Sequence, residues 1–462
     1  MINLKYIKNQ KFNETKLVEV LFYTFPLWFI VGNLAVSINT LLFIVASLFL
    51  IQRKQLTLRF HNSYWFLIVL FLFSFFIRIP SIFIYGDTSL DNEWKILVNN
   101  LTDYGKLYSI LPYFLFKFED FFMPNLFMPP LYAFYLYFFK VFNFSNEIYI
   151  LVVLFSQSIL SSFSVVIFYI INKLFFSNKI SIFGTLIFSL FPLHIYACGQ
   201  ISSVTLQSFL IVVFFYFFFK TVKKDNFFNI CFLSLTSGLL ILLRGEFIAF
   251  FILSILYIAL FLKMNLKSIV MIILLTIVVI SPYLMRNIML VDTITITKSV
   301  GYNLWKGNNP NSTVEGNAFF DLNLREQISK IPKDKHYDIN VDKVFLNEGL
   351  KNIKNNPTKY FGLYLKKIFS FIFININSLY PNYYHPLHYL PVLFIGITSI
   401  IGIILSDKNS YQMNFLILFF IANVAIVSVF FILPRYLLAI IPLQIIFSNI
   451  FFENITNNFF KT

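Results

Sequence analysis

The stretch IYILVVLFSQSILSSFSVVIFYIIN (residues 148–172) decides the fold class of this chain, because it contains no charged residue between Glu147 and Lys173. An uncharged apolar run of about 18 residues or more can cross the hydrocarbon core of a bilayer as an α-helix. We therefore expect residues 148–172 to form a transmembrane helix.

Apolar segments of this kind recur along the whole chain of 462 residues, which is 58% hydrophobic and 12% charged, with a mean hydropathy of +0.76. Soluble domains carry about 25% charged residues. The composition, with only two cysteines, excludes a soluble enzyme, a disordered protein and a disulfide scaffold. The other segments lie at roughly 17–33, 36–51, 63–84, 180–197, 203–220, 227–243, 246–263, 267–284, 388–406, 412–432 and 435–452. The sequence predicts an all-α polytopic membrane protein, a helical bundle of about 12 transmembrane helices.

The net charge of +15 is explained by topology. With the N-terminus in the cytoplasm, nearly all lysines and arginines of the short loops fall on the cytoplasmic side, as the positive-inside rule expects. The doubtful segments 129–143 and 360–379 are then interpreted as helices at the outer interface. We expect a multi-pass protein of the cytoplasmic (inner) membrane with both termini inside, a lipid bilayer as partner and no nucleic acid.

This topology divides the chain into four parts. Residues 1–62 are a cytoplasmic segment and an additional transmembrane hairpin. Residues 63–291 form a transmembrane core that includes a large outer loop, 85–147. Residues 292–387 form a small extracytoplasmic subdomain with an interfacial helix, and residues 388–462 hold the C-terminal transmembrane helices.

The outer loop 85–147 concentrates acids in a basic protein, and Asp87, Asp91 and Glu93 open a predicted helix over 89–104. Apolar residues at helical spacing give this helix one apolar face, suited to the membrane surface. These residues are Trp94, Leu97, Val98 and Leu101. The acids are candidates for chemistry, and helix capping explains them equally well.

Four arginines, Arg78, Arg244, Arg286 and Arg435, lie beside apolar segments at predicted outer boundaries. A single arginine there is usually an anchor that reaches the interface. Several on the side where positive charge is disfavoured indicate a phosphate partner, since a guanidinium matches phosphate oxygens.

The stretch GYNLWKGNNP (301–310) combines aromatic and amide side chains. Stacking of Tyr302 and Trp305 on a sugar, with hydrogen bonds from Asn303 and Asn308 to its hydroxyls, is one interpretation. A set of turns is the other. No phosphate-binding GxxxxGK[ST] motif and no HExxH zinc motif occurs in the sequence, and its histidines form no strong metal pattern.

Together, four stretches resemble the C-type (GT-C) membrane glycosyltransferases, and in particular glycosyltransferase family 39, the protein mannosyltransferase and aminoarabinose transferase group. They are DNEWKILVNNLTDYGK (91–106), PPLYAFYLYFF (129–139), SPYLMRN with GYNLWKGNNP (281–310) and PRYLLAIIPL (434–443). The resemblance covers roughly residues 63–452. It implies a GT-C-type bundle that transfers a sugar from a polyprenyl-phosphate donor to a glycan, lipid or protein acceptor on the extracytoplasmic face.

The resemblance also assigns roles. It implies that Asp91 is the catalytic carboxylate of an inverting displacement, with Asp87 in reserve. A second carboxylate would come from Asp87, Glu93 or Glu246, or be absent. Arg244, Arg286 and Arg435 would bind the donor phosphate. Sugar or acceptor contacts would come from Tyr302, Asn303, Trp305, Asn308 and Tyr132. No cofactor is certain and a divalent metal stays open. Phe127 and Met128 stand where some members of that family have Glu-Lys, the glutamate for a metal and the lysine for phosphate.

Two other functions stay open. An O-antigen-type ligase or polymerase would use polyprenyl-linked glycans, with Arg325, His336, His385 and His388 in its large outer loop. A lipid-linked glycan flippase or transporter should bury ionisable groups at mid-span, and the predicted spans hold almost none.

Overall fold

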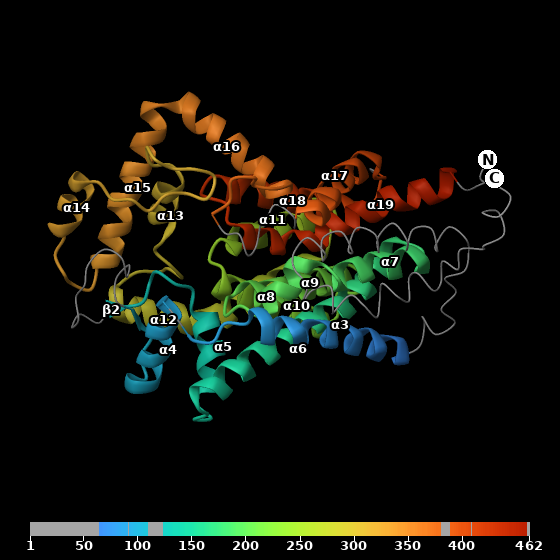
Figure 1. The fold of residues 1–462 in the computed structure, drawn as a ribbon, viewed down its shortest axis with the longest axis horizontal. Coiled ribbons are helices and arrows are strands. Elements are labelled where there is room, and N and C mark those ends of the chain that lie inside the picture. Colours follow the sequence, from blue (N-terminus) through green and yellow to red (C-terminus); the bar gives the residue numbers. More distant parts are fainter. Residues whose placement is uncertain (1–63, 91, 110–122, 380–388, 408, 460–462) are drawn as a thin grey trace, which may run out of the picture.

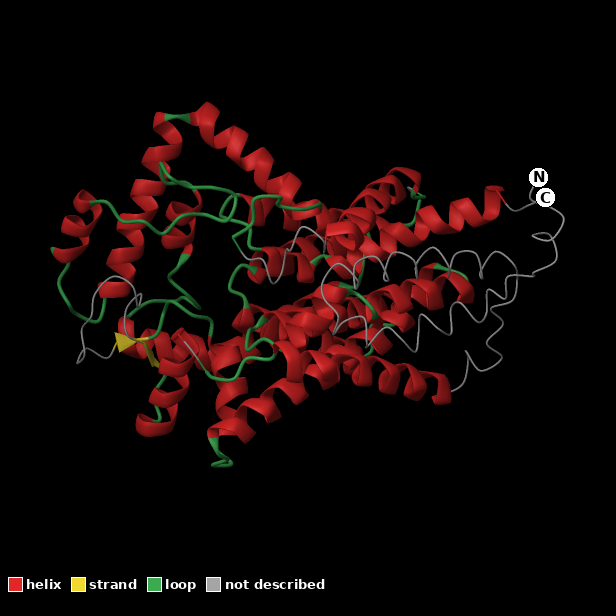
Figure 2. Ribbon diagram, in the orientation of Figure 1, coloured by secondary structure: helices red, strands yellow, loops and turns green. Residues whose placement is uncertain are grey.

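The computed structural model describes residues 64–90, 92–109, 123–379, 389–407 and 409–459. Within these ranges the protein consists of 18 helices and one two-stranded antiparallel sheet, β1 (Tyr108–Ser109) with β2 (Met123–Pro124) (Figure 2). The expected all-α architecture is confirmed. The predicted segments 17–33 and 36–51, and the residues Asp91, His385 and His388, lie outside the described residues.

Among the described residues, five helices are long and apolar enough to cross a membrane: α3 (Tyr64–Tyr85), α6 (Asn146–Phe175), α9 (Val204–Lys223), α12 (Leu266–Val291) and α18 (Tyr411–Ser428). A sixth crossing results if α7 (Asn178–Ser189) and α8 (Pro192–Cys198), which are bent by 48°, act as one span. Further helices at predicted spans are α10 (Phe227–Leu243), α11 (Phe247–Leu260), α17 (Tyr389–Leu405) and α19 (Ile441–Phe459). The protein is therefore a polytopic helical membrane protein, and the total of twelve spans stays a prediction.

The helix α6 begins and ends where its sequence indicates. Ser145 precedes the first turn, and its hydroxyl accepts a hydrogen bond from the backbone N–H of Ile148. Glu147 lies in the first turn and Lys173 in the last. Both charges oppose the partial charges of the helix ends, so the apolar run is bounded on each side.

The helices lie side by side in an elongated bundle, with α3 and α9 against α6, α10 against α12, and α17 against α19 (Figure 1). Small polar residues join some of these pairs. The hydroxyls of Thr398 in α17 and Ser448 in α19 are 2.8 Å apart. At Gly402 an added Cβ would collide with the backbone of Phe447. Close backbone approach and such hydrogen bonds hold helices together where lipid offers no hydrophobic driving force.

Arg78 corrects one sequence expectation. It was placed at the outer boundary beside lipid phosphate, but its side chain is fully buried within the bundle. Its Nε donates to the hydroxyl of Ser161 (2.8 Å), and its Nη1 donates to the carbonyl of Ser74 (2.7 Å). Serines of α3 and α6 thus supply partners for two nitrogens of the buried guanidinium, while its Nη2 is buried without a hydrogen bond among the described residues.

The helices α13 (Val300–Gly307), α14 (Leu322–Ser329) and α15 (Tyr337–Asn355) stand at one end of the bundle, here called the subdomain end (Figure 1). They enclose a separate aromatic core in which Trp305 stacks on Phe320 at 4.9 Å and packs on Phe345 at 5.1 Å. From α15 the chain returns to the bundle through α16 (Pro357–Ile372).

The last residue of α13 forms the joint between subdomain and bundle. An added Cβ at Gly307 would collide with the backbone carbonyl of Phe430, so only glycine allows the two backbones to touch. The buried ammonium of Lys367 in α16 donates to the carbonyl of Gly307 (2.8 Å) and to Oδ1 of Asn308 (3.2 Å). The joint is thus fixed from two sides.

Two short helices cover the subdomain end of α10 and α12. They are α4 (Asn92–Tyr104) and α5 (Pro130–Lys140). The predicted apolar face of α4 exists, but Leu97, Val98 and Leu101 pack inside the protein. They lie against residues of α5 and against Tyr283 rather than at a membrane surface, because neighbouring helices supply the apolar cover.

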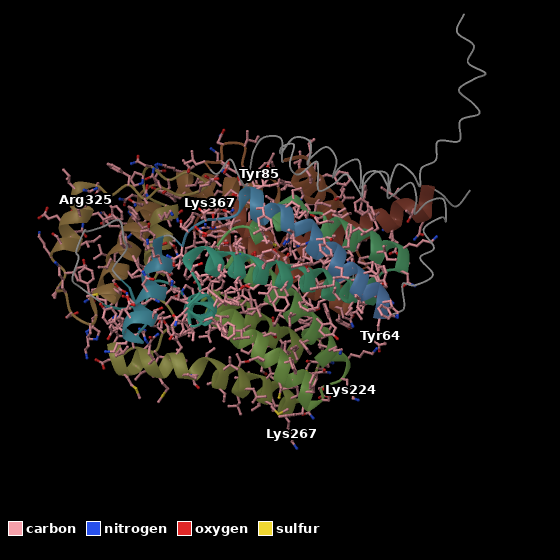
Figure 3. The ribbon with its side chains drawn as sticks, turned by 60° about the horizontal axis from the view of Figure 1, so that its bottom comes forward. Tyr64, Tyr85, Lys224, Lys267, Arg325 and Lys367 are labelled. Carbon is pink, nitrogen blue, oxygen red and sulfur yellow. The ribbon has the colours of Figure 1, made fainter. Side chains whose placement is uncertain are left out.

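The cationic loops also separate along the bundle. Figure 3 shows Lys224 and Lys267 near Tyr64, the first residue of α3, and away from Arg325 in the subdomain. Lys224 follows α9, and Lys267 lies in the first turn of α12. This arrangement agrees with the sequence expectation that the loop lysines share one side, and it leaves the identity of that side as a prediction.

Candidate functional site

A pocket of about 470 Å³ lies where the subdomain ends of the bundle helices meet α13. Six separate stretches of chain form its walls. Three of them are the residues at the start of α4, α5 and α9. The others are the link between α10 and α11, the helix α13 with the residues before it, and the 3₁₀ helix η3 (Pro434–Ala439) with the residues before it. Its charged lining consists of Asp87, Glu93, Arg244, Glu246, Lys306 and Arg435. We call it the charged pocket.

The charged pocket has three acids, two from the stretch 87–93 and one from the link between α10 and α11. Asp87 follows α3, and its carboxylate accepts a hydrogen bond from the backbone N–H of Ile201 (2.6 Å). Glu93 lies in the first turn of α4, and Glu246 immediately precedes α11. The predicted Asp87, Glu93 and Glu246 therefore meet in one pocket. Asp91 belongs to the same stretch as Asp87 and Glu93 but lies outside the described residues.

The cations of the charged pocket are Arg244, Lys306 and Arg435. Arg244 donates to Oε1 of Gln207 (3.0 Å), and its guanidinium lies 5.5 Å from the ring centre of Tyr436. The ammonium of Lys306 lies 4.5 Å from the ring centre of Phe431. Burial and the nearby charge of Arg435 lower the pKa of Lys306. Two cations thus lie close together at one wall.

Four of the six charged side chains of this pocket form no close ion pair within the described residues. Within the described residues, no ion pair of 4.0 Å or less involves Glu93, Glu246, Lys306 or Arg435. Opposite charges that share a pocket without pairing leave their hydrogen-bonding groups available to a ligand, as is common at binding and catalytic sites.

Helix N-termini also converge on this pocket. The residues that precede α5, α9, α11 and α13 all line it: Pro129, Ser203, Glu246 and Ser299. None of them makes a side-chain cap to its own helix. The first turns of a helix leave N–H groups without intrahelical partners and carry a partial positive charge. The pocket therefore combines three cations with several positive helix ends, an environment that suits an anion.

Two of the predicted sugar contacts lie in the charged pocket. Tyr302 and Asn303 on α13 line it, and Tyr302 is nearly buried, 5% exposed. Burial, reinforced by the charge of Glu93, raises the pKa of the Tyr302 hydroxyl. The aromatic wall continues with Phe127, whose ring lies 5.5 Å from that of Tyr302. Residue 127, which departs from the motif of some relatives, therefore contributes apolar surface.

The other three predicted contacts are buried away from the pocket lining. Trp305 belongs to the aromatic core of the subdomain. Asn308 donates to the carbonyls of Leu304 and Val429, both at 2.9 Å. Tyr132 is fully buried and donates to Oε1 of Gln157 (2.8 Å). These three therefore do not line the pocket with Tyr302 and Asn303, although the rings of Trp305 and Tyr302 are 6.0 Å apart.

Arg286 lies in a second pocket. Its guanidinium donates to the carbonyls of Leu107 (2.6 Å) and Asn125 (3.1 Å) and to Oδ1 of Asn287 (2.6 Å). This pocket has a volume of about 440 Å³ and is mostly apolar, with Leu131 and Leu290 among its lining. We call it the apolar pocket. The structure separates Arg286 from Arg244 and Arg435.

The two pockets adjoin. Pro129 lines the charged pocket and Pro130 the apolar one, while Leu243 and Leu242 divide in the same way. A short wall, formed by the start of α5 and the end of α10, therefore stands between them.

Metal binding finds no support in the part of the chain that the structure describes, where no group of three or more His, Cys, Asp or Glu side chains could hold an ion. The main site residue that the sequence reasoning missed is Lys306. Its signal was present, since it is the single charge within GYNLWKGNNP, but that stretch was interpreted through its aromatic and amide side chains alone.

A comparison of the sequence with protein-family models gives no match, and a comparison with curated proteins gives none either. The resemblance to the GT-C glycosyltransferases therefore rests on the four stretches quoted above.

Proposed function

We propose that this protein is a membrane glycosyltransferase that transfers a sugar from a polyprenyl-phosphate donor to an acceptor on the extracytoplasmic face of the cytoplasmic membrane. The observation that carries the proposal is the charged pocket, which brings three carboxylates and three cations together in one lining. Transfer from a lipid phosphate needs both: a base for the acceptor hydroxyl and positive charge for the leaving group.

The phosphate end of the reaction is assigned to Arg435, Lys306 and Arg244. As the bond from sugar to phosphate breaks, negative charge grows on the phosphate oxygens, and preorganised cations and helix N-termini stabilise that charge. Lys306 and Arg435 lie near each other, and an anion between them would relieve their mutual repulsion. Arg286 is not assigned to this role, because its donors already bind protein oxygens.

The base is assigned to the stretch 87–93. An acceptor hydroxyl must lose a proton as it attacks the anomeric carbon, and a positioned carboxylate contributes about 10²–10⁴-fold to such a step. Asp91 holds the position that the resemblance gives to the catalytic acid, and Asp87 and Glu93 line the pocket. One inverting displacement forms the new glycosidic bond, breaks the sugar–phosphate bond and releases polyprenyl phosphate.

The apolar pocket suits the first part of a prenyl chain. Apart from Arg286 and Lys106 its walls are largely leucine, proline and aromatic side chains, and the wall at Pro129 and Pro130 separates it from the charged pocket by adjacent residues. A lipid phosphate is amphipathic in the same sense, with one charged end and one apolar chain.

The deciding experiment compares cells with and without the gene for surface glycans and for accumulated polyprenyl-phosphate sugars. We expect loss of one glycan modification and accumulation of its lipid-linked donor. In complemented cells Asp91→Asn should abolish transfer while the protein remains inserted. Full activity in that variant with an inactive Asp87→Asn would assign the base to Asp87, and full activity in both would refute the mechanism.

The ligase and flippase alternatives have less support. In the described part of the chain, Arg325 and His336 do not line either pocket. Arg325 is exposed on α14, and His336 lies 3.7 Å from Asp292 at the surface. Neither alternative accounts for the presence of both acids and cations in the charged pocket.

A further inference from the structure

The segment between α8 and α9 leaves helical geometry inside the protein. α8 ends at Cys198 and α9 begins at Val204, and we call residues 199–203 the helix break. Backbone groups that a continuous helix would pair must find other partners there, because an unpaired backbone group in a membrane protein interior is strongly unfavourable.

One glutamine supplies two of these partners. Gln157 lies within the apolar helix α6 and is fully buried. Its Nε2 donates to the carbonyls of Cys198 (3.2 Å) and Gln200 (2.9 Å). Since both carbonyls can only accept, the NH₂ end of the amide must face the helix break.

The other end of the same amide is also fixed. Oε1 of Gln157 accepts the hydroxyl proton of Tyr132 in α5 (2.8 Å). The amide therefore has one orientation, with its oxygen toward α5 and its nitrogen toward the helix break. A buried polar group with all bonds made holds its neighbours in a specific arrangement.

The helix break in turn holds Asp87. The backbone N–H of Asp87 donates to the carbonyl of Gly199 (2.8 Å), and that of Ile201 donates to Oδ2 of Asp87 (2.6 Å). Ile201 lines the charged pocket together with Ser202 and Ser203. Bonds thus lead from Tyr132 through Gln157 and the helix break to an acid of the pocket.

We propose that Gln157 is a positioning residue of the charged pocket, which sets the helix break and through it the carboxylate of Asp87. Gln157 does not line the pocket, so it acts only through these bonds. This inference rests on the proposed function, because the consequence of a displaced Asp87 is measured as lost sugar transfer.

The test uses the full-length protein and two readouts. Transfer is measured as surface glycan in complemented deletion cells, normalised to inserted protein. Binding is measured with undecaprenyl phosphate as the probe on purified protein. Gln157→Leu keeps the approximate side-chain size and removes all three bonds. We expect transfer to fall about 100-fold, since a shift of about 1 Å in the stretch 87–93, which carries the base, has an effect of that order, while affinity for the probe is kept.

Two further variants keep the proposal open to refutation. Tyr132→Phe removes only the bond that orients the amide and should lower transfer less; combined with Gln157→Leu it should add nothing, because both act through the helix break. Ser162→Ala is the matched control. Ser162 is buried in the same helix and donates to Ser158 of that helix (2.7 Å), so its loss should leave transfer unchanged.

Unchanged transfer in Gln157→Leu would overturn the proposal. So would a parallel loss of probe affinity and transfer, which would indicate collapse of the pocket, or an equal loss in Ser162→Ala. Failure of the proposed function has a different signature: deletion of the gene would then leave surface glycans and polyprenyl-phosphate sugars as they were.

Discussion

The two adjoining pockets use arginine in opposite ways. In the apolar pocket Arg286 makes three hydrogen bonds to protein oxygens. In the charged pocket the side chain of Arg435 makes no hydrogen bond or ion pair to another described residue, although acids share its pocket. An arginine next to an apolar span is therefore not a ligand site by position alone. What decides is whether nearby carbonyls already occupy its donors.

The largest effect is expected from charge reversal in the charged pocket. Arg435→Glu should weaken binding of undecaprenyl phosphate about 1,000-fold, because it removes a contact to the phosphate and adds repulsion. Binding is measured on purified protein by titration. Arg325→Glu, an exposed change on α14, serves as the control for altered net charge. Equal affinity in wild type and Arg435→Glu would refute the phosphate role.

The next prediction distinguishes the role of Trp305, in the core of the subdomain, from that of Asn303, which lines the charged pocket. Trp305→Ala should lower the free energy of unfolding by about 3 kcal/mol or more, because it empties the aromatic core of the subdomain. Asn303→Ala, at the pocket wall, should leave stability intact and reduce transfer. Thermal or denaturant unfolding measures the first effect and the cell assay the second. A stable Trp305→Ala protein without transfer would return Trp305 to the sugar site.

Arg286→Gln tests the other half of the comparison. It leaves the carbonyls of Leu107 and Asn125 without a charged donor, and we expect a loss of about 2 kcal/mol in stability. Affinity for undecaprenyl phosphate should be the same as in wild type. A loss of affinity without a loss of stability would mean that Arg286 binds phosphate after all.

The last effect concerns the dependence of stability on pH through Asp338 in the subdomain. Burial raises the pKa of Asp338 on α15 to about 7 from its ordinary 3.8. The folded protein therefore binds the proton of Asp338 more tightly than the unfolded chain does. This raises the free energy of unfolding below about pH 4, and the gain is lost as the pH rises to about 7. The unfolding temperature should fall by a few degrees over that interval. Asp338→Asn should flatten the dependence, and an unchanged slope would contradict the assignment.

The sequence predicted the architecture well where a single period or a long uncharged run decides the structure. The helix over 148–172 and the apolar face of α4 follow from composition and spacing. The sequence does not show, however, whether lipid or protein covers such a face. Leu97 and Leu101 suit lipid and protein equally, and only the position of Tyr283, far along the chain, decides between them.

The candidate site was predictable to a similar extent. Acids and arginines at predicted boundaries converge as Asp87, Glu93, Arg244 and Arg435. Contacts between segments far apart in the chain are invisible in the sequence. Trp305, Asn308 and Arg286 look like ligand-binding residues, yet in the structure they contact Phe320, Val429 and Leu107, which lie outside their own helices.

Gly307 fixes the spacing between two residues that line the charged pocket, its chain neighbour Lys306 and the neighbour of Phe430, Phe431. The subdomain rests there on the backbone of Phe430, with no side chain between the two surfaces. A contact between backbone atoms has a fixed thickness, so substitutions at other positions cannot change this spacing by degrees. Changes in the size of the ligand accepted should instead arise from the side chains that face inward, such as Phe431 and Tyr302.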